Sequence, residues 1–176
     1  MNRNGEERSP WKGLVAGLAG GAVASFLMNQ FQELMADDDG REQSHGAQSL
    51  QPNGHSSIDD DATERLADRA AKLITKKRLN RREKHNAGKI VHYAYGTLMG
   101  GAYGLATEYR RQPSVKSGMA FGSSAWAFGD EVAVPLLGLS KGLGGYPVST
   151  HIRSFGSHMV YGFTTEVVRR SLRRLL

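Results

Sequence analysis

The sequence predicts an all-α protein: a small helical membrane bundle of three to four glycine-rich spans, with one amphipathic surface helix beside it. Three observations lead to this prediction. Small residues recur at every fourth position in two stretches, and long stretches of the chain carry no formal charge. A separate basic segment has the apolar period of an amphipathic helix.

Small residues line one face of at least two predicted helices. Residues four apart lie on one helix face, so a row of glycines leaves the backbone nearly bare and lets another helix approach closely. In water each of these glycines would cost about 1 kcal/mol relative to alanine, so the rows need a packing reason. We expect helix contacts at Gly13, Gly17, Gly21, Ser25, Gly96, Gly100, Gly104 and, in a later segment, Gly162.

The charge-free stretches are long enough to cross a bilayer. A spanning helix needs about 20 mostly apolar residues, and residues 13–32 and 90–107 contain no Asp, Glu, Lys or Arg. Residues 117–140 are also long enough but contain two acids and a proline, and residues 152–168 contain an arginine, a histidine and a glutamate. These four segments are the predicted spans, although the fourth can instead lie at the membrane interface.

The polar residues gather between the first two of these segments. The whole chain has a mean hydropathy of −0.44 and 39% hydrophobic residues, which is typical of a soluble domain, but the average hides this uneven distribution. We divide the chain into an N-terminal region with the first membrane helix (1–35), a polar flexible linker (36–60), a basic amphipathic helix (61–88) and a membrane helical bundle (89–176).

The basic amphipathic helix begins with an acidic pair, Asp61 and Glu64, and its apolar residues fall on one face. Basic residues suited to anionic lipid headgroups follow: Lys76, Lys77, Arg78, Arg81 and Arg82. The alternative is a solvated helix that packs on the protein or binds an acidic partner. The net charge of +6 also raises nucleic acid as a partner, but the basic run has no aromatic residue to stack on a base, so we do not expect it.

Signatures of catalysis and of cofactor binding are absent from the sequence. The chain has no cysteine, which excludes disulfides and thiolate chemistry. It has no phosphate-binding loop, nucleophile elbow, zinc-protease motif or dinucleotide fingerprint. We therefore expect no enzyme activity, no cofactor and no metal. The segment 22–24 resembles a signal-peptidase site, although the apolar run continues past it.

Five ionisable residues within the apolar segments are candidate proton-titrating groups: His92, Asp130, Glu131, His158 and Glu166. Such residues cost about 2.5 to 3.5 kcal/mol each on membrane-insertion scales, so they indicate function or internal pairing. In the functional interpretation, Asp130, Glu131, His158 and Glu166 form a proton-accessible cluster whose histidine titrates near neutral pH. In the structural interpretation, which we favour, Glu166 pairs with Arg169 or Arg170 at helical spacing and the histidines form hydrogen bonds between helices.

The C-terminal half carries a family resemblance. Its features are the sequence PLLGLS at 135–140, Pro147 in the following loop, and SFGSHMVYGFTTEVVRRSLRR at 154–174. On these residues the segment 116–174 resembles the YagU-type family of bacterial inner-membrane proteins. The resemblance implies a small multi-span protein linked to acid tolerance, with no established biochemical activity. His158, Glu166 and Arg169 occupy matching positions, and the N-terminal third matches only as a hydrophobic helix followed by a long polar loop.

Three functions are consistent with these observations. We expect a multi-pass protein of the bacterial inner (cytoplasmic) membrane, without catalytic activity, that contributes to acid or envelope stress tolerance and can form a homo-oligomer. The alternatives are a small channel or proton-linked transporter, and a membrane-anchored interaction module whose basic helix binds lipid or an acidic partner. The distribution of Lys and Arg favours three spans with the N-terminus outside. The family-like end favours a fourth span, so the span count and the orientation remain open.

Overall fold

The computed structural model describes residues 9–43, 62–76, 78–109, 115–140 and 143–176, without the side chains of residues 36–43 and 143. Within these ranges the chain is helical and has no strand, so the all-α class is confirmed. The elements are α1 (Pro10–Gln43), α2 (Ala62–Thr75), α3 (Arg81–Glu108), α4 (Val115–Ser124), the π-helix η1 (Ala125–Ala133), α5 (Val134–Leu136), the 3₁₀ turn η2 (Leu143–Gly145) and α6 (Val148–Leu175).

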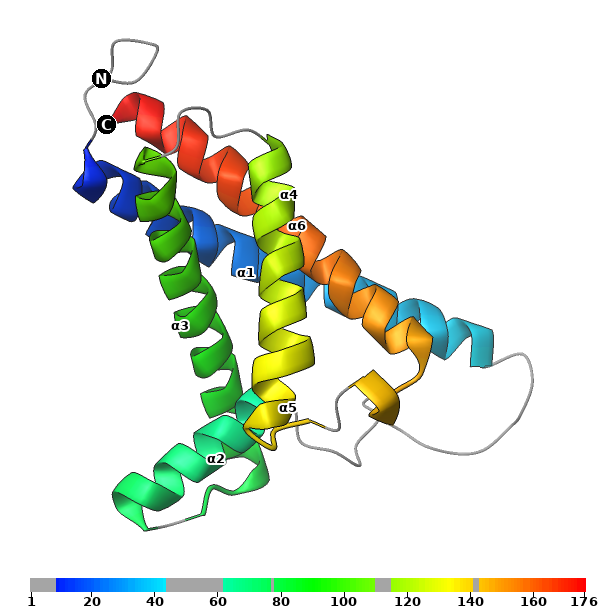
Figure 1. The fold of residues 1–176 in the computed structure, drawn as a ribbon. Coiled ribbons are helices and arrows are strands. Elements are labelled where there is room, and N and C mark those ends of the chain that lie inside the picture. The colour runs from blue at the N-terminus through cyan, green and yellow to red at the C-terminus, as the bar shows by residue number, and fades with distance from the viewer. Residues whose placement is uncertain (1–8, 44–61, 77, 110–114, 141–142) are drawn as a thin grey trace.

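Four long helical segments form the body of the molecule (Figure 1). One of them, which we call the α4–α5 rod, runs without interruption through α4, η1 and α5. α1 packs against both α3 and α6, and α4 packs against the other side of α6. α2 lies across the start of α3, at the opposite end from the two chain termini. The bundle therefore has one end that carries both termini and one end that carries the α2–α3 hairpin.

Glycine rows form the contact between α1 and α3. A Cβ added at Gly21 would lie 2.5 Å from the carbonyl oxygen of Gly96, and one at Gly100 would lie 2.5 Å from the Cα of Gly21. Similar Cβ atoms at Gly17 and Gly104 would meet the backbone of the facing helix. The two backbones thus touch directly, and no side chain larger than hydrogen fits at these positions.

A second glycine contact joins α4 to α6. A Cβ at Gly118 would lie 2.6 Å from the carbonyl oxygen of Gly162, and one at Gly162 would lie 2.7 Å from the backbone nitrogen of Gly122. The glycine pair Gly118 and Gly122 has the same four-residue spacing as the rows in α1 and α3, although the sequence analysis named only Gly162 on this side. The α1–α3 and α4–α6 contacts therefore both depend on bare backbone.

The basic segment predicted as one helix over 61–88 is two helices, so this boundary is corrected. α2 ends at Thr75, and Lys76 adopts a positive φ of 56°, which a helix does not tolerate. α3 then begins after Asn80, whose side chain accepts a hydrogen bond from the Glu83 N–H at 2.9 Å while the Glu83 carboxylate accepts one from the Asn80 N–H. This capping box stops α3 from continuing backward.

Two other predicted boundaries also move. α1 continues to Gln43, eight residues into the segment predicted as a flexible linker, because the Ala, Asp, Glu, Gln and Arg residues there are compatible with a helix once the apolar run has ended. The rest of that linker, together with Asp61 and Lys77, lies outside the described residues. α3 begins before the predicted second span and includes its basic flank.

The proline of the predicted third span lies just after η1. Pro135 has no N–H to donate, so the carbonyl four residues before it loses its helical partner. The chain responds by widening, and the Val134 N–H donates to the Gly129 carbonyl five residues back. The rod stays continuous through the proline, and the wide turns of η1 carry Asp130 and Glu131.

One described helix, over Pro10–Met35 of α1, is long and apolar enough to cross a membrane by length and composition. A core helix of a soluble protein or a signal sequence would pass the same test. The other three long segments do not reach this threshold in the described residues, so the spans predicted at 90–107, 117–140 and 152–168 lack that support.

The glycine contacts predict opposite effects for two alanine substitutions. Gly100→Ala should lower the free energy of unfolding by about 1 to 3 kcal/mol, because the new methyl group overlaps the α1 backbone. The control is Gly156→Ala in α6, where the methyl group would meet only the Phe31 ring at 3.5 Å, an ordinary contact. This variant should be neutral or more stable by up to about 1 kcal/mol. Thermal unfolding followed by circular dichroism measures both, and a Gly100→Ala protein as stable as the parent would contradict the packing.

Candidate functional site

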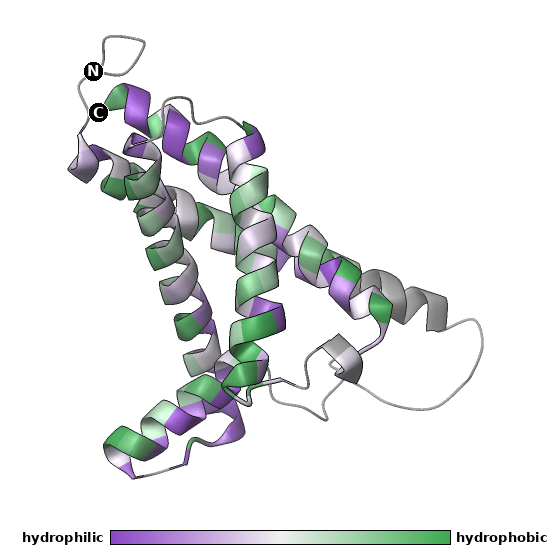
Figure 2. Ribbon diagram, in the orientation of Figure 1, coloured by the Kyte–Doolittle hydropathy of each residue, from purple (hydrophilic) through white to green (hydrophobic). Residues whose placement is uncertain are grey.

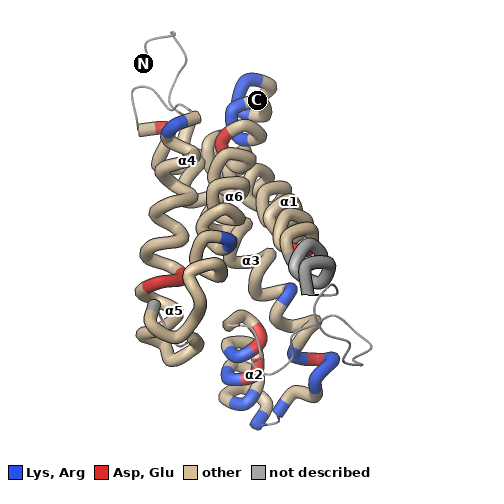
Figure 3. Tube along the Cα trace, turned by 90° about the vertical axis from the view of Figure 1, so that its right-hand side faces the viewer, with Lys and Arg blue, Asp and Glu red and all other residues tan. Residues whose placement is uncertain are grey.

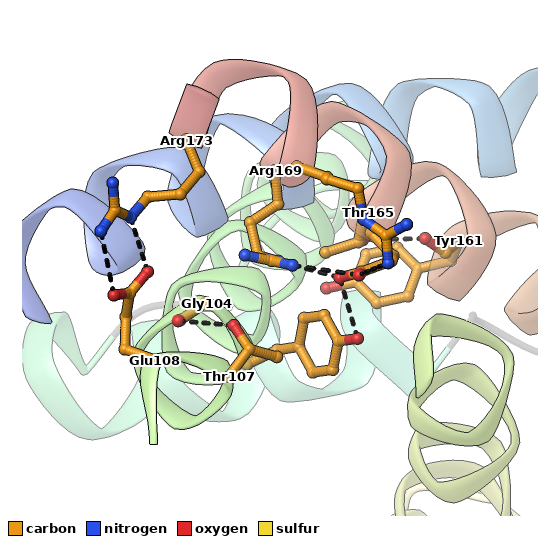
Figure 4. A network of polar contacts seen from close by, with 10 residues as sticks. Gly104, Thr107, Glu108, Tyr161, Thr165, Arg169 and Arg173 are labelled. Atoms are coloured by element: carbon orange, nitrogen blue, oxygen red, sulfur yellow. Dashed lines mark hydrogen bonds and ion pairs between the residues drawn. The ribbon is translucent and has the colours of Figure 1, made fainter. Parts of the chain in front are cut away.

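A carboxylate with no solvent exposure lies at the centre of the bundle. Glu166 of α6 accepts hydrogen bonds from Arg169 Nε at 2.8 Å and from Arg170 Nη2 at 2.8 Å. The Tyr103 hydroxyl of α3 donates to the same carboxylate at 3.0 Å. Figure 4 shows these side chains converging from α3 and α6. We call these four residues the Glu166 network; it contains the pairing that the structural interpretation predicted, and Tyr103 adds a link between helices.

A second carboxylate pair lies one turn further toward the termini. Arg173 of α6 contacts Glu108 at the end of α3 with a 2.7 Å bond from Nε, and the Ser9 N–H donates to Glu108 at 3.2 Å (Figure 4). Burial raises the pKa of Glu108, but the hydrogen bonds and charge of Arg173 outweigh burial and bring this pKa below its usual value of 4.5. Lys12 also donates to the Leu176 carbonyl, so α1, α3 and α6 are tied together at this end.

The acids of η1 face polar residues of α6. Asp130 accepts a 2.5 Å hydrogen bond from the Ser154 hydroxyl, and His158 Nδ1 lies 3.8 Å from the same carboxylate oxygen. We call these three residues the Asp130 cluster. Glu131 contacts His151 Nδ1 at 2.7 Å and is 9% exposed, so the two neighbouring acids have different partners.

The structure separates the five candidate proton-titrating residues into three places. Asp130 and His158 lie together, and His92 of α3 lines the same cavity. Glu131 belongs to the pair with His151. Glu166 belongs to the network with the arginines, two helical turns from His158 along α6. The single cluster of Asp130, Glu131, His158 and Glu166 that the functional interpretation requires is therefore not formed.

The cavity has a volume of about 290 Å³ and lies between α1, α2, α3, η1 and α6. Most of its wall is apolar, with Met28, Val91, Met99 and Leu137 among the lining residues. Asp130, His158 and His92 contribute polar groups to this wall. α2 covers one side of it, because Arg69 donates hydrogen bonds to the carbonyls of the turn that follows α5.

The predicted lipid-binding residues gather at the hairpin end of the bundle. All four described members are exposed: Lys76 and Arg78 in the connection between α2 and α3, and Arg81 and Arg82 in the first turn of α3. Figure 3 shows Lys and Arg gathered around this hairpin. Lys77 lies outside the described residues. Lys and Arg also gather at the opposite end, around the C-terminus of α6, so the molecule has basic groups at both ends (Figure 3).

Sequence analysis missed several contributing residues. Tyr103, His151, Ser154 and Arg173 were not among the candidate site residues, yet each contacts one of the acids of the bundle. The four-residue spacing that links Ser154, His158 and Glu166 was the available clue to a polar face, but it does not reveal which helix that face meets.

Comparison with family models, curated proteins and solved structures gives no match for this chain. The function therefore rests on the geometry of the chain itself. The YagU-type resemblance of residues 116–174 stays an expectation drawn from sequence.

The Glu166 network predicts a large loss of stability on neutralising the buried carboxylate. Glu166→Gln leaves Arg169 buried without a counter-charge and should lower the free energy of unfolding by about 3 to 5 kcal/mol. Tyr103→Phe removes one hydrogen bond but keeps the charges balanced, so its effect should be smaller, about 1 to 3 kcal/mol. Denaturant unfolding of the two variants gives the order, and equal losses would argue against a charge-balancing role for Glu166.

The Glu108 pair predicts a pH-dependent contribution to stability. Because the folded-state pKa is lowered, this contribution is complete above the unfolded value of 4.5 and is lost as the pH falls through the folded-state pKa. Glu108→Gln should destabilise the protein by about 1.5 to 3 kcal/mol at pH 7, and its difference from the parent should shrink below pH 4.5. Melting temperatures across pH 3 to 7 test this with the exposed-site control Glu33→Gln; a pH-independent difference would refute it.

Proposed function

We propose that this protein is an integral membrane protein without catalytic activity, in which α1, α3, the α4–α5 rod and α6 cross the bilayer as four spans. One observation carries the proposal: glycine and polar residues fill the interior, while large apolar side chains lie on the outer surface. In water this arrangement would expose apolar surface and bury charge. In a bilayer, hydrocarbon covers the apolar side chains and close backbone packing holds the helices together.

The inverted distribution holds for every long segment. Each one carries a large apolar side chain that is about half exposed or more: Phe26 (50%), Leu98 (67%), Phe128 (71%) and Phe163 (49%). Hydrophobic residues run along the outside of α3 and the rod (Figure 2). The largest side chains with full burial are instead Glu166, Thr165, Ser25 and Ser157.

The positions of the charged residues also support a bundle that crosses the bilayer. Most Lys and Arg lie toward the two ends of the bundle, and one basic position on α6 and the acids before α5 lie between them (Figure 3). The charge-free part of α3, residues 90–107, is about 27 Å long at 1.5 Å per residue, close to the hydrocarbon thickness of about 30 Å. α3 and α6 have a low mean hydropathy because their inner faces carry glycine, serine, threonine and histidine. These inner faces pack against other helices and do not contact lipid.

The proposed role is a contribution to acid or envelope stress tolerance in the bacterial inner membrane. The resemblance of residues 116–174 supports this role, as does the lowered pKa of Glu108. That pair with Arg173 persists to a lower pH than an ordinary carboxylate would allow. The contribution of this pair to stability is lost only when the pH falls through the lowered folded-state pKa of Glu108.

Specific observations favour the two alternatives. The Asp130 cluster on a cavity wall favours a small channel or proton-linked transporter. On α2, Leu73 and Ile74 are 83% and 82% exposed beside the basic residues of the hairpin end. That combination favours an interaction module that inserts into an anionic membrane surface.

The membrane proposal predicts where the protein sediments and where its ends lie. In bacterial cells it should pellet with membranes, resist a carbonate wash and dissolve only in detergent. Ser9 contacts Glu108 and Lys12 contacts Leu176, so compartment-sensitive reporters on the two termini should report the same side. A monodisperse helical protein in the detergent-free supernatant would refute the proposal. Reporters on opposite sides would refute four crossings.

A further inference from the structure

We propose that the cavity between α1, α2, α3, η1 and α6 is a binding site for a small amphipathic organic cation, with Asp130 as the counter-ion. This inference goes beyond a structural role in the membrane. It rests on the charge of the cavity wall, the partners of the other carboxylates and the geometry of η1.

Asp130 differs from the other acids of the bundle. Glu166 and Glu108 each contact arginine, and Glu131 contacts His151 at 2.7 Å; these three carboxylates are 0%, 8% and 9% exposed. Asp130 is 40% exposed, and its described partners are a serine hydroxyl and His158 at 3.8 Å. Among Glu108, Asp130, Glu131 and Glu166, Asp130 is thus the acid whose nearest described nitrogen lies as far away as 3.8 Å.

That charge faces a cavity whose described lining includes no lysine and no arginine. His158 Nδ1 lies 2.9 Å from the Ser154 carbonyl, which can only accept, so Nδ1 carries the proton. A carboxylate beside apolar walls is costly unless a cation balances it, so the site selects for positive charge and against anions.

The rest of the wall suits the apolar body of such a ligand. Met28, Met99 and Val134 supply flexible and branched apolar contacts, and the aromatic rings of Tyr95 and Tyr161 line the same cavity. Aromatic rings attract organic cations through their negative faces. The volume of about 290 Å³ falls at the lower end of ligand pockets, about 300 to 1,000 Å³, so the ligand is small.

The wide helix η1 places Asp130 on this wall. π-helical turns occur often at functional sites, because the extra residue per turn redirects a side chain. Gly129 also lines the cavity, and a Cβ there would meet only the Tyr95 hydroxyl at 3.9 Å. The open space at Gly129 offers a way to fill the cavity without disturbing a helix contact.

The test uses the purified full chain in detergent with three probes of similar shape: benzyltrimethylammonium, the uncharged isostere neopentylbenzene and the anion phenylmethanesulfonate. Titration calorimetry and ligand-observed NMR should give saturable one-to-one binding of the cation, at least tenfold tighter than either other probe. Asp130→Asn should weaken cation binding at least tenfold and leave the weak binding of the uncharged probe unchanged. Glu131→Gln is the matched control, because Glu131 does not line the cavity, and it should bind the cation like the parent.

Gly129→Leu provides a second route if Asp130→Asn fails to fold, and it should abolish cation binding while keeping the melting temperature. A short-chain phosphatidylethanolamine, compared with free phenethylamine, separates a lipid headgroup amine from a soluble amine as the source of the charge. The proposal is overturned if the cation and the uncharged isostere bind equally, if the filled cavity binds the cation as well as the parent does, or if the folded parent shows no saturable cation binding at millimolar concentration.

Discussion

The direct contact of bare backbones between helices is the constraint on which the rest of this structure depends. Between α1 and α3, and again between α4 and α6, a glycine of one helix lies against the main chain of the other. The short separation leaves no room for a conventional apolar core, and the buried apolar residues are accordingly few, with Ala24, Met28 and Tyr161 as their main cluster. Stability must then come from dispersion between close backbones and from polar contacts that cross the same interfaces.

The polar contacts follow from that geometry. Because α6 lies close to both α1 and α4, its polar row is enclosed on several sides, and Glu166 can be buried only with two arginines and a tyrosine hydroxyl around it. The same row reaches the wall of the cavity at His158, where the facing residues belong to the wider turns of η1. The polar face of α6 is thus tightly enclosed at Glu166 and borders open space at His158, two turns earlier on the same helix.

The sequence predicted the helical class and the small-residue faces, because a four-residue spacing translates directly into one side of a helix. Gly17, Gly100 and Gly162 lie at helix contacts in the structure. The spacing does not tell which helix packs against a given face. The contacts of Tyr103 with Glu166 and of Glu108 with Arg173, which join α3 to α6, were therefore not predicted. The break at Lys76 depends on a single backbone dihedral, and the π-helical turns depend on how the chain accommodates Pro135. Neither the break nor the π-helical turns produce a periodic pattern in the sequence.

The first helix and the last are neighbours, and this has a consequence for biosynthesis. α1 emerges from the ribosome long before α6, yet Gly20 of α1 packs within 2.8 Å of the Thr165 carbonyl when a Cβ is placed on it. Before α6 has been made, the face of α1 that packs on α6 is uncovered. Glu108 at the end of α3 then also lacks its partner Arg173. The nascent chain can therefore form only a half-assembled hairpin pair. Once α6 has emerged, it can pack on α1 and α4 and supply Arg173 to Glu108, which closes the bundle.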